Sequence, residues 1–164
     1  MDFEENFYKT VTELCKVHYI SSFKPMQRLC LKNLLLDRDV LACLPTGFGK
    51  SLIFQSWPTA CKILSNVYGM FKWHGDPILL VVCPLLSVIK DQIRHLESIG
   101  ISAACAGEIP EMDTEISQGK HTIVFGTPET LVGNKTWRRV LQTPLIQQRL
   151  VGIAVDEVHT VIQW

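Results

Sequence analysis

The stretch Leu44–Ser51 reads Leu-Pro-Thr-Gly-Phe-Gly-Lys-Ser and places two glycines, a lysine and a hydroxyl between an apolar run and a helical pattern. Gly47 and Gly49 allow the backbone to curl with its N–H groups pointing inward, and a helix beginning here adds partial positive charge. Lys50 would supply a full charge to the β- and γ-phosphates of a nucleoside triphosphate, and Ser51 would supply a hydroxyl ligand for Mg²⁺. The stretch therefore predicts a triphosphate cradle, with leucine at the first position, where the pattern GxxxxGK[ST] has glycine.

A second candidate feature is the acidic pair Asp156-Glu157, which follows the apolar run 150–155. One carboxylate of such a pair can hold Mg²⁺ while its neighbour orients or deprotonates an attacking water. An apolar run that ends in Asp-Glu is by itself more often a solvated strand end, and Gly-x-Gly-Lys-Ser can occur in a loop by chance. Together, the two features predict the site of a nucleoside triphosphatase.

The composition is that of a folded domain, with 164 residues, 47% of them apolar and 20% charged. A chain of this length fits one domain and is long enough to bury a sizeable core. Lysine and arginine number 16, as do aspartate and glutamate, so no global basic field indicates nucleic acid and any such binding must be local.

Cysteine usage and the N-terminus indicate an intracellular setting. The 6 cysteines include no C-x-x-C pair, which argues against a zinc site and against a compact disulfide framework. Cys43 and Cys83 lie in apolar runs and are expected to be small core residues. Because the N-terminus is acidic and no apolar run could span a membrane, we expect an intracellular protein without a membrane partner, in the nucleus of a eukaryote and otherwise in the cytoplasm.

Apolar periodicity and turn residues predict helices alternating with strands. Helices are expected over 3–17, 25–36, 50–65, 85–98, 111–118, 128–132 and 135–141, with one further turn opened by Pro144. Strands are expected over 40–44, 78–83, 101–106, 122–125 and 150–155. Unbroken apolar strands of this kind predict an α/β fold with a parallel sheet covered on both faces. Ligands bind such sheets outside the carboxyl ends of the strands, where the cradle, Pro84, Thr127 and Asp156 are all expected.

The motifs, in this order and over nearly the whole chain, resemble the RecQ-type DNA helicases of helicase superfamily 2. Residues 23–27 (Phe-Lys-Pro-Met-Gln) are similar to the adenine-reading motif, 44–55 to motif I, 81–92 to motif Ia, 126–129 to motif Ib and 156–159 (Asp-Glu-Val-His) to the DEAH-like motif II. A leucine at position 44 is normal for that superfamily. Lys90-Asp91-Gln92 and Gln163-Trp164 favour the RecQ branch, while Val158 and Thr160 depart from its usual alanine and cysteine and indicate a divergent member.

The resemblance implies a RecA-like P-loop lobe, with residues 1–24 as an N-terminal helix and lead-in and 25–164 as an ATP-binding domain that stops after motif II. It implies ATP and Mg²⁺ as cofactors, with Gln27 on the adenine edge and Ser51 and Asp156 on the metal. The remaining nucleotide-binding positions are Thr46, Gly47, Phe48, Gly49 and Lys50. The catalytic set is Lys50, Asp156, Glu157 and His159, and the set that grips the phosphates of a DNA strand is Pro84, Ser87, Thr127 and Pro128.

The leading hypothesis is the ATP-binding lobe of an ATP-dependent 3′-to-5′ DNA helicase that acts on a single strand or fork. A second RecA-like lobe, absent from this chain, would close over ATP, so we expect the isolated lobe to hydrolyse ATP poorly. We also expect a sheet that lacks the strand following motif II. Two alternatives stay open: a non-catalytic nucleotide- or DNA-binding module derived from such a helicase, and another P-loop NTPase without nucleic acid, which residues 23–27 and 90–92 disfavour.

Overall fold

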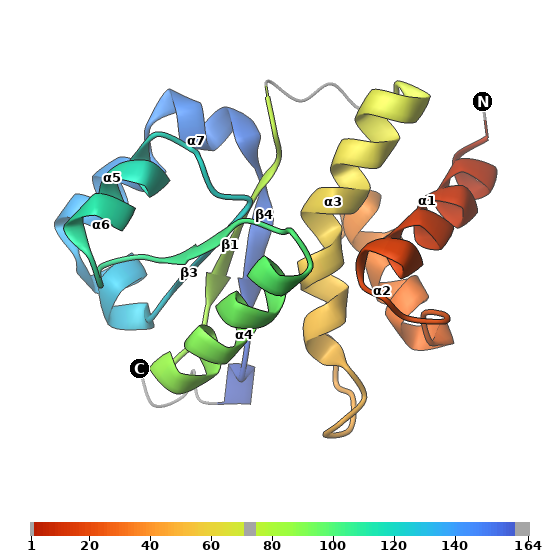
Figure 1. Ribbon diagram of the computed structural model, residues 1–164, viewed down its shortest axis with the longest axis horizontal. Coiled ribbons are helices and arrows are strands. Elements are labelled where there is room, and N and C mark those ends of the chain that lie inside the picture. Colours follow the sequence, from red (N-terminus) through yellow and green to blue (C-terminus); the bar gives the residue numbers. More distant parts are fainter. Residues whose placement is uncertain (1, 71–74, 160–164) are drawn as a thin grey trace. The chain divides into compact units, whose positions relative to one another are not determined.

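The computed structural model describes residues 2–70 and 75–159, which belong to two compact units, 1–73 and 74–164. The first unit contains three helices (Figure 1): α1 (Phe3–Val17), α2 (Pro25–Leu35) and α3 (Lys50–Tyr68). Helices α1 and α2 begin at the predicted residues, where the Asp2 carboxylate accepts a hydrogen bond of 3.1 Å from the Glu4 amide and Pro25 occupies the first turn of α2. Both features satisfy or remove backbone donors that a helix start leaves without partners.

The core of the first unit lies where α1 and α2 pack against α3. Each helix buries apolar residues at helical spacing, among them Phe7 and Leu14 of α1, Leu31 of α2, and Ile53 and Leu64 of α3. One polar contact is buried with them, a 3.0 Å hydrogen bond between His18 Nε2 and Ser56 Oγ. This packing fixes α2 beside the start of α3, which is where the glycine-rich loop lies.

The strand expected over 40–44 is not formed, and that prediction was wrong. Among the described residues none pairs with this segment, and Leu41 is 75% exposed. Cys43 is also exposed, contrary to its expected place in the core. An apolar run becomes a strand only when neighbouring strands accept its backbone hydrogen bonds, and apolar composition alone does not supply them.

The second unit holds a four-stranded, entirely parallel sheet in the order β2-β3-β1-β4. This confirms the predicted α/β fold class and its parallel sheet. The elements are β1 (Ile78–Val82), α4 (Leu86–Ser98), β2 (Ala103–Cys105), α5 (Pro110–Ser117), β3 (Ile123–Gly126), the π-helix η1 (Glu129–Gly133), α6 (Lys135–Leu141), α7 (Pro144–Arg149) and β4 (Leu150–Val155). Most bounds agree with the predicted ones within a few residues.

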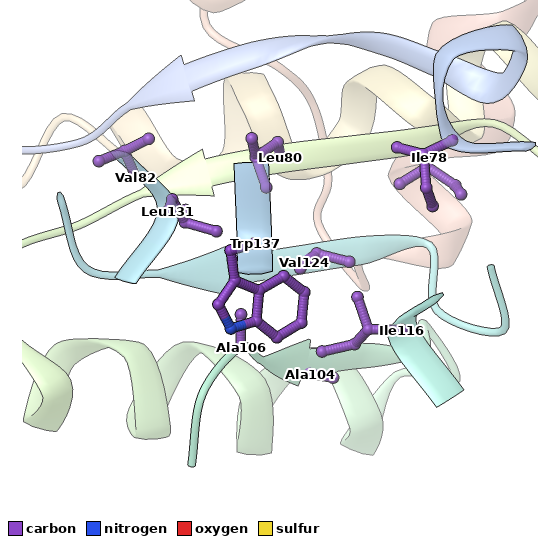
Figure 2. Packing of buried hydrophobic residues seen from close by; sticks show 10 residues of the cluster. Ile78, Leu80, Val82, Ala104, Ala106, Ile116, Val124, Leu131 and Trp137 are labelled. Carbon is purple, nitrogen blue, oxygen red and sulfur yellow. The ribbon is translucent and has the colours of Figure 1, made fainter. Parts of the chain in front are cut away.

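Strands β1 and β3 are buried on both faces, as expected for parallel strands, whereas β4 is only partly buried, with Ile153 57% exposed. On one face, Leu80 and Val124 pack with Ile116 of α5 and Trp137 of α6, and Figure 2 shows the Trp137 ring among these strand residues. The residues that alternate with them along β1 and β3, such as Val81 and Phe125, are fully buried as well. Within the described part of the chain, no helix is both long enough and apolar enough to cross a membrane.

Candidate functional site

The glycine-rich loop adopts the backbone conformation that its residue types predict. Gly47 and Gly49 have φ values of +75° and +84°, in the left-handed region where a side chain is strained. Gly49 caps α3, a helix of 19 residues, so the N–H groups in the first turn of α3 point back toward the loop. A Cβ at Gly47 would meet no atom within 4 Å, which leaves open space on the side of the loop where a ligand could approach. The loop therefore fits a bound phosphate group.

Gln27 fixes this loop through its side-chain amide. Its Nε2 donates hydrogen bonds of 3.0 Å to the Phe48 carbonyl and 3.0 Å to the Gly49 carbonyl, and its Oε1 accepts one of 2.8 Å from the Lys24 amide. Gln27 is only 3% exposed, so these bonds are shielded from water. A Cβ at Gly49 would lie 2.7 Å from Gln27 Nε2, which shows how closely the two approach. The geometry links the residue predicted to read adenine to the phosphate loop itself.

Sequence reasoning missed the contribution of Lys24. Its Nζ donates a 3.1 Å hydrogen bond to the Phe48 carbonyl and lies 4.4 Å from the centroid of the Phe48 ring. A lysine over an aromatic face gains a cation–π attraction in addition to its hydrogen bond. The position of Lys24, three residues before Gln27 at the start of the same helix, was the sequence signal that could have indicated this contact.

The remaining residues of the loop are Lys50, Ser51 and Thr46, and the Lys50 side chain makes a contact within the loop. Lys50 Nζ donates a 3.2 Å hydrogen bond to the Leu44 carbonyl, so the cation is held by the loop. Ser51 stands half-buried in the first turn of α3, and Thr46 is exposed in the turn before it. A lysine beside two left-handed glycines and a helix N-terminus is a donor set for a polyanion.

The second unit gathers the other predicted residues at the carboxyl ends of three adjacent strands. Val82 is paired with Gly126 on one side and Val155 on the other, so the residues that follow these strands are neighbours. Pro84 follows β1, Thr127 and Pro128 follow β3, and Asp156 follows β4. Ser87 is exposed on the first turn of α4. Three of the four features expected at strand carboxyl ends thus lie at one edge of this sheet, which we call the rim (Pro84, Thr127 and Asp156), while the glycine-rich loop belongs to the first unit.

Asp156 is oriented by two donors. Gln92 Nε2 of α4 donates a 3.1 Å hydrogen bond to Asp156 Oδ2, and the Glu157 amide donates one of 3.0 Å to Asp156 Oδ1. Glu157 has a φ of +55°, which is uncommon for a residue other than glycine and occurs often at functional sites. Its Oε2 lies 3.3 Å from His159 Nδ1, with 74% of the histidine side chain exposed. A carboxylate held this way retains lone pairs for a hard cation such as Mg²⁺.

Cys83, at the end of β1, is not a nucleophile for this rim. Burial, together with the nearby charges of Asp156 and Glu157, raises the pKa of its thiol above the ordinary value of 9.0. The thiol therefore stays protonated at neutral pH, and the thiolate is the reactive form. Its buried position agrees with the core role expected from the sequence.

The structure thus brings Gln27 together with the loop 46–51 in the first unit, and Asp156 together with Glu157 and His159 in the second. Thr127 makes only local contacts, through its Oγ1 to the Thr130 amide and hydroxyl. Thr160 and the pair Gln163-Trp164 lie outside the described residues. The structure gives the positions of the predicted site residues within its described part, and their functional roles stay predictions.

Known proteins resemble this chain over most of its length. The DEAD/DEAH box helicase family matches residues 24–164. The chain is 31% identical to ATP-dependent DNA helicase Q1 of Rattus norvegicus over 90% of its own length and 23% of that protein. It is 33% identical to ATP-dependent DNA helicase RecQ of Synechocystis over 87% of its own length and 27% of that protein. The chain spans about a quarter of the length of these relatives.

Two glycine substitutions test the contact between Gln27 and the loop. Gly47→Ala introduces only the strain of a left-handed alanine, roughly 1–2 kcal/mol. Gly49→Ala adds a steric conflict with Gln27 Nε2, and we expect at least about 1 kcal/mol of further destabilisation from the displaced hydrogen bonds. Urea unfolding of both variants measures the difference. Equal losses of stability in the two variants would show that Gln27 does not constrain the loop.

Proposed function

Because this chain belongs to the DEAD/DEAH box helicase family, we propose that it is the ATP-binding lobe of an ATP-dependent 3′-to-5′ DNA helicase of RecQ type. The RecQ-type resemblance found in its motifs is confirmed by relatives named ATP-dependent DNA helicase Q1 and RecQ. The observation that carries the proposal is the glycine-rich loop held by Gln27, with Lys50 at the start of α3. Within it, we propose residues 1–24 as the lead-in and 25–164 as the ATP-binding domain.

ATP binding at the loop would exchange one partner of Lys50 for another. In the structure the ammonium group donates to the neutral Leu44 carbonyl. A hydrogen bond from a cation to a neutral acceptor contributes about 1.5–3 kcal/mol, and phosphate oxygens that carry formal charge make stronger and shorter bonds with it. The exchange therefore favours the phosphates, and breaking the contact with Leu44 becomes one step of nucleotide binding.

The hydrolytic roles are proposed for oxygen-bearing residues that match the family motifs. Ser51 and Asp156 each carry a hard oxygen donor of the kind that Mg²⁺ prefers, and from the family resemblance we propose them as its ligands. When bound, Mg²⁺ would neutralise charge on the β- and γ-phosphate oxygens. Glu157 would orient or deprotonate the attacking water, and His159, beside the Glu157 carboxylate, would carry the state of that site toward bound DNA.

DNA binding is proposed for the polar and turn residues that follow β1 and β3. Ser87 and Thr127 offer hydroxyl donors to the phosphates of a single strand, and Pro84 and Pro128 shape the backbone beside them. The hydrogen bond from Gln92 of α4 to Asp156 connects the helix that carries Ser87 in its first turn to the proposed metal ligand. A shift of α4 on DNA binding would therefore move the Gln92 amide that holds the Asp156 carboxylate.

A second candidate function is a nucleotide- or DNA-binding module without turnover. The glycine-rich loop and Lys50 are compatible with it, because donors that hold a triphosphate do not by themselves hydrolyse it. ATP turnover stimulated by single-stranded DNA separates the two functions. It would be present for the helicase lobe in its full-length protein and absent for the module.

Lys50→Ala tests the cradle. We expect the dissociation constant for Mg²⁺-ATP to rise at least about tenfold, because a charged donor to the phosphates is lost. The circular dichroism spectrum should not change, since Lys50 is half-buried and outside the core. Lys16→Ala, which removes an exposed lysine of α1, is the matched control. Titration calorimetry measures both variants, and equal affinity in the Lys50 variant and the unchanged chain would refute the assignment.

Gln27→Ala separates base recognition from loop support. If Gln27 also binds adenine, the preference of the chain for ATP over GTP, expected to be about tenfold or more, should fall toward one, because a polar contact that selects the base is lost. If Gln27 only holds the loop, both nucleotides should weaken by the same factor. Competition binding with the two nucleotides gives the ratio directly.

A further inference from the structure

A cavity of about 710 Å³ lies in the second unit at the edge of the sheet opposite to the rim of Pro84, Thr127 and Asp156. It is bounded by the residues before β1, the residues before β3 and the end of α7. All of its lining residues belong to this unit, so the cavity is independent of the glycine-rich loop. No role proposed above uses it.

Arg149, the last residue of α7, is positioned in this cavity by the backbone around it. Its Nε donates a 2.7 Å hydrogen bond to the Asp76 carbonyl. A Cβ at Gly75 would lie 3.3 Å from Arg149 Cδ, and one at Gly119 would come into direct conflict with the guanidinium group. Both glycines have positive φ, +113° and +69°, so a larger residue would be strained there as well as crowded. Two glycines therefore form a slot that holds the arginine.

Within residues 2–70 and 75–159, several side-chain donors around Arg149 have no internal partner. Among the described residues, no hydrogen bond or ion pair engages the Arg149 Nη atoms, the Lys120 ammonium group or the Thr122 hydroxyl, and the Gln148 amide is equally available. Asp76 is the one acidic residue among the described lining residues, and its interactions are already made elsewhere than with these donors. The cavity thus presents two cations and two neutral polar groups against one carboxylate.

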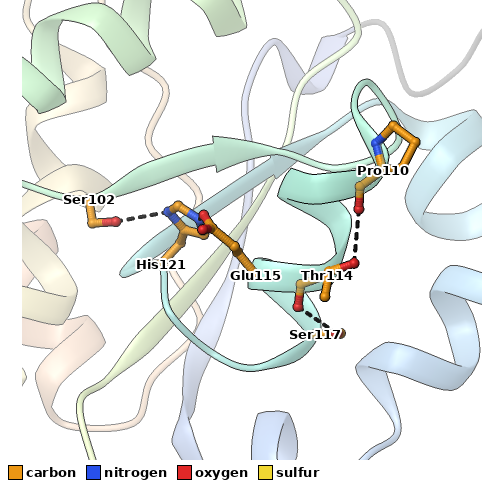
Figure 3. A network of polar contacts seen from close by, with 6 residues as sticks. All are labelled: Ser102, Pro110, Thr114, Glu115, Ser117 and His121. Carbon is orange, nitrogen blue, oxygen red and sulfur yellow. Dashed lines mark hydrogen bonds and ion pairs between the residues drawn. The ribbon is translucent and has the colours of Figure 1, made fainter.

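His121 forms part of the wall rather than a further donor. Figure 3 shows His121 between Ser102 and Glu115. Its Nδ1 lies 2.8 Å from Ser102 Oγ and its Nε2 lies 3.1 Å from Glu115 Oε2, so both ring nitrogens are engaged. These contacts tie the starts of β2 and β3 to α5 and hold the 119–122 turn in place. The Glu115 carboxylate is directed at His121 and does not offset the charge of Lys120 and Arg149.

We propose that this cavity binds a phosphate group, with Arg149 as the principal contact and Lys120 as a second cation. A guanidinium group fixed at Nε presents its remaining N–H groups as a fork that matches two oxygens of a phosphate. Thr122 and Gln148 supply neutral donors for the other oxygens. The phosphate could belong to a free anion or to the backbone of a nucleic acid strand, and both sources present the same chemistry to the site.

The test is a ¹⁵N NMR titration of the chain carrying Lys50→Ala, which removes phosphate binding at the glycine-rich loop. Inorganic phosphate is one titrant and a short thymidine oligonucleotide is the other. We expect saturable shifts of the Gly75, Gly119 and Thr122 amide signals. Arg149→Gln should weaken binding at least about tenfold, and Lys120→Gln about threefold, as expected for the loss of charged donors.

Arg94→Gln is the matched control, because Arg94 is an exposed arginine of the same unit that pairs with Asp91 on α4. It should leave the affinity unchanged. Absence of shifts at millimolar phosphate and with the oligonucleotide, or equal effects of Arg149→Gln and Arg94→Gln, would overturn the proposal. If Arg149→Gln does not fold, the affinity of the Lys120→Gln variant is compared with that of Arg94→Gln instead, and equal affinities would overturn the proposal.

The two titrants identify the source of the phosphate. Shifts with inorganic phosphate alone support a free anion, and shifts with both titrants support a nucleic acid backbone. Because the titrations use the Lys50→Ala chain, their outcome is separate from that of the ATP-binding proposal. If the phosphate-binding proposal for this cavity fails, the ATP-binding proposal for the glycine-rich loop is unaffected, and the reverse also holds.

Discussion

The side-chain amide of Gln27 is the constraint on which the candidate nucleotide site depends. Its three hydrogen bonds join the start of α2 to the two carbonyls that precede α3. Because Gln27 is buried, replacing these bonds with water would require the packing of α2 against α3 to open. The left-handed glycines give the loop its shape, and Gln27 selects that shape from those that glycine permits.

A similar principle organises the second unit, where polar residues at strand ends are positioned by a packed sheet. Asp156 follows β4, and its amide donates to the Val82 carbonyl of β1, which continues the strand pairing up to the carboxylate. Gln92 then fixes the carboxylate from α4. The buried strands β1 and β3 thus determine where the acidic pair and the turn residues lie, and substitutions among them would move the rim as a whole.

The sequence predicted most of this because several independent signals agreed. Apolar periodicity placed the helix starts at residues 3 and 25, where α1 and α2 begin, and unbroken apolar runs marked the strands of the parallel sheet. The segment 40–44 failed because strand formation depends on partners that apolar composition does not reveal. The contacts from Gln27 to the Phe48 and Gly49 carbonyls, and from Lys50 to Leu44, could not be predicted either. They depend on how close α2 comes to the loop and on which acceptor a flexible side chain finds nearest.

A crystal structure of the chain with Mg²⁺ and a non-hydrolysable ATP analogue would show whether the loop is a triphosphate cradle. We predict that Lys50 Nζ leaves the Leu44 carbonyl and contacts β- and γ-phosphate oxygens, while the loop keeps its left-handed glycines. A structure in which the analogue binds elsewhere, with Lys50 still donating to Leu44, would contradict the assignment of this loop as a triphosphate cradle.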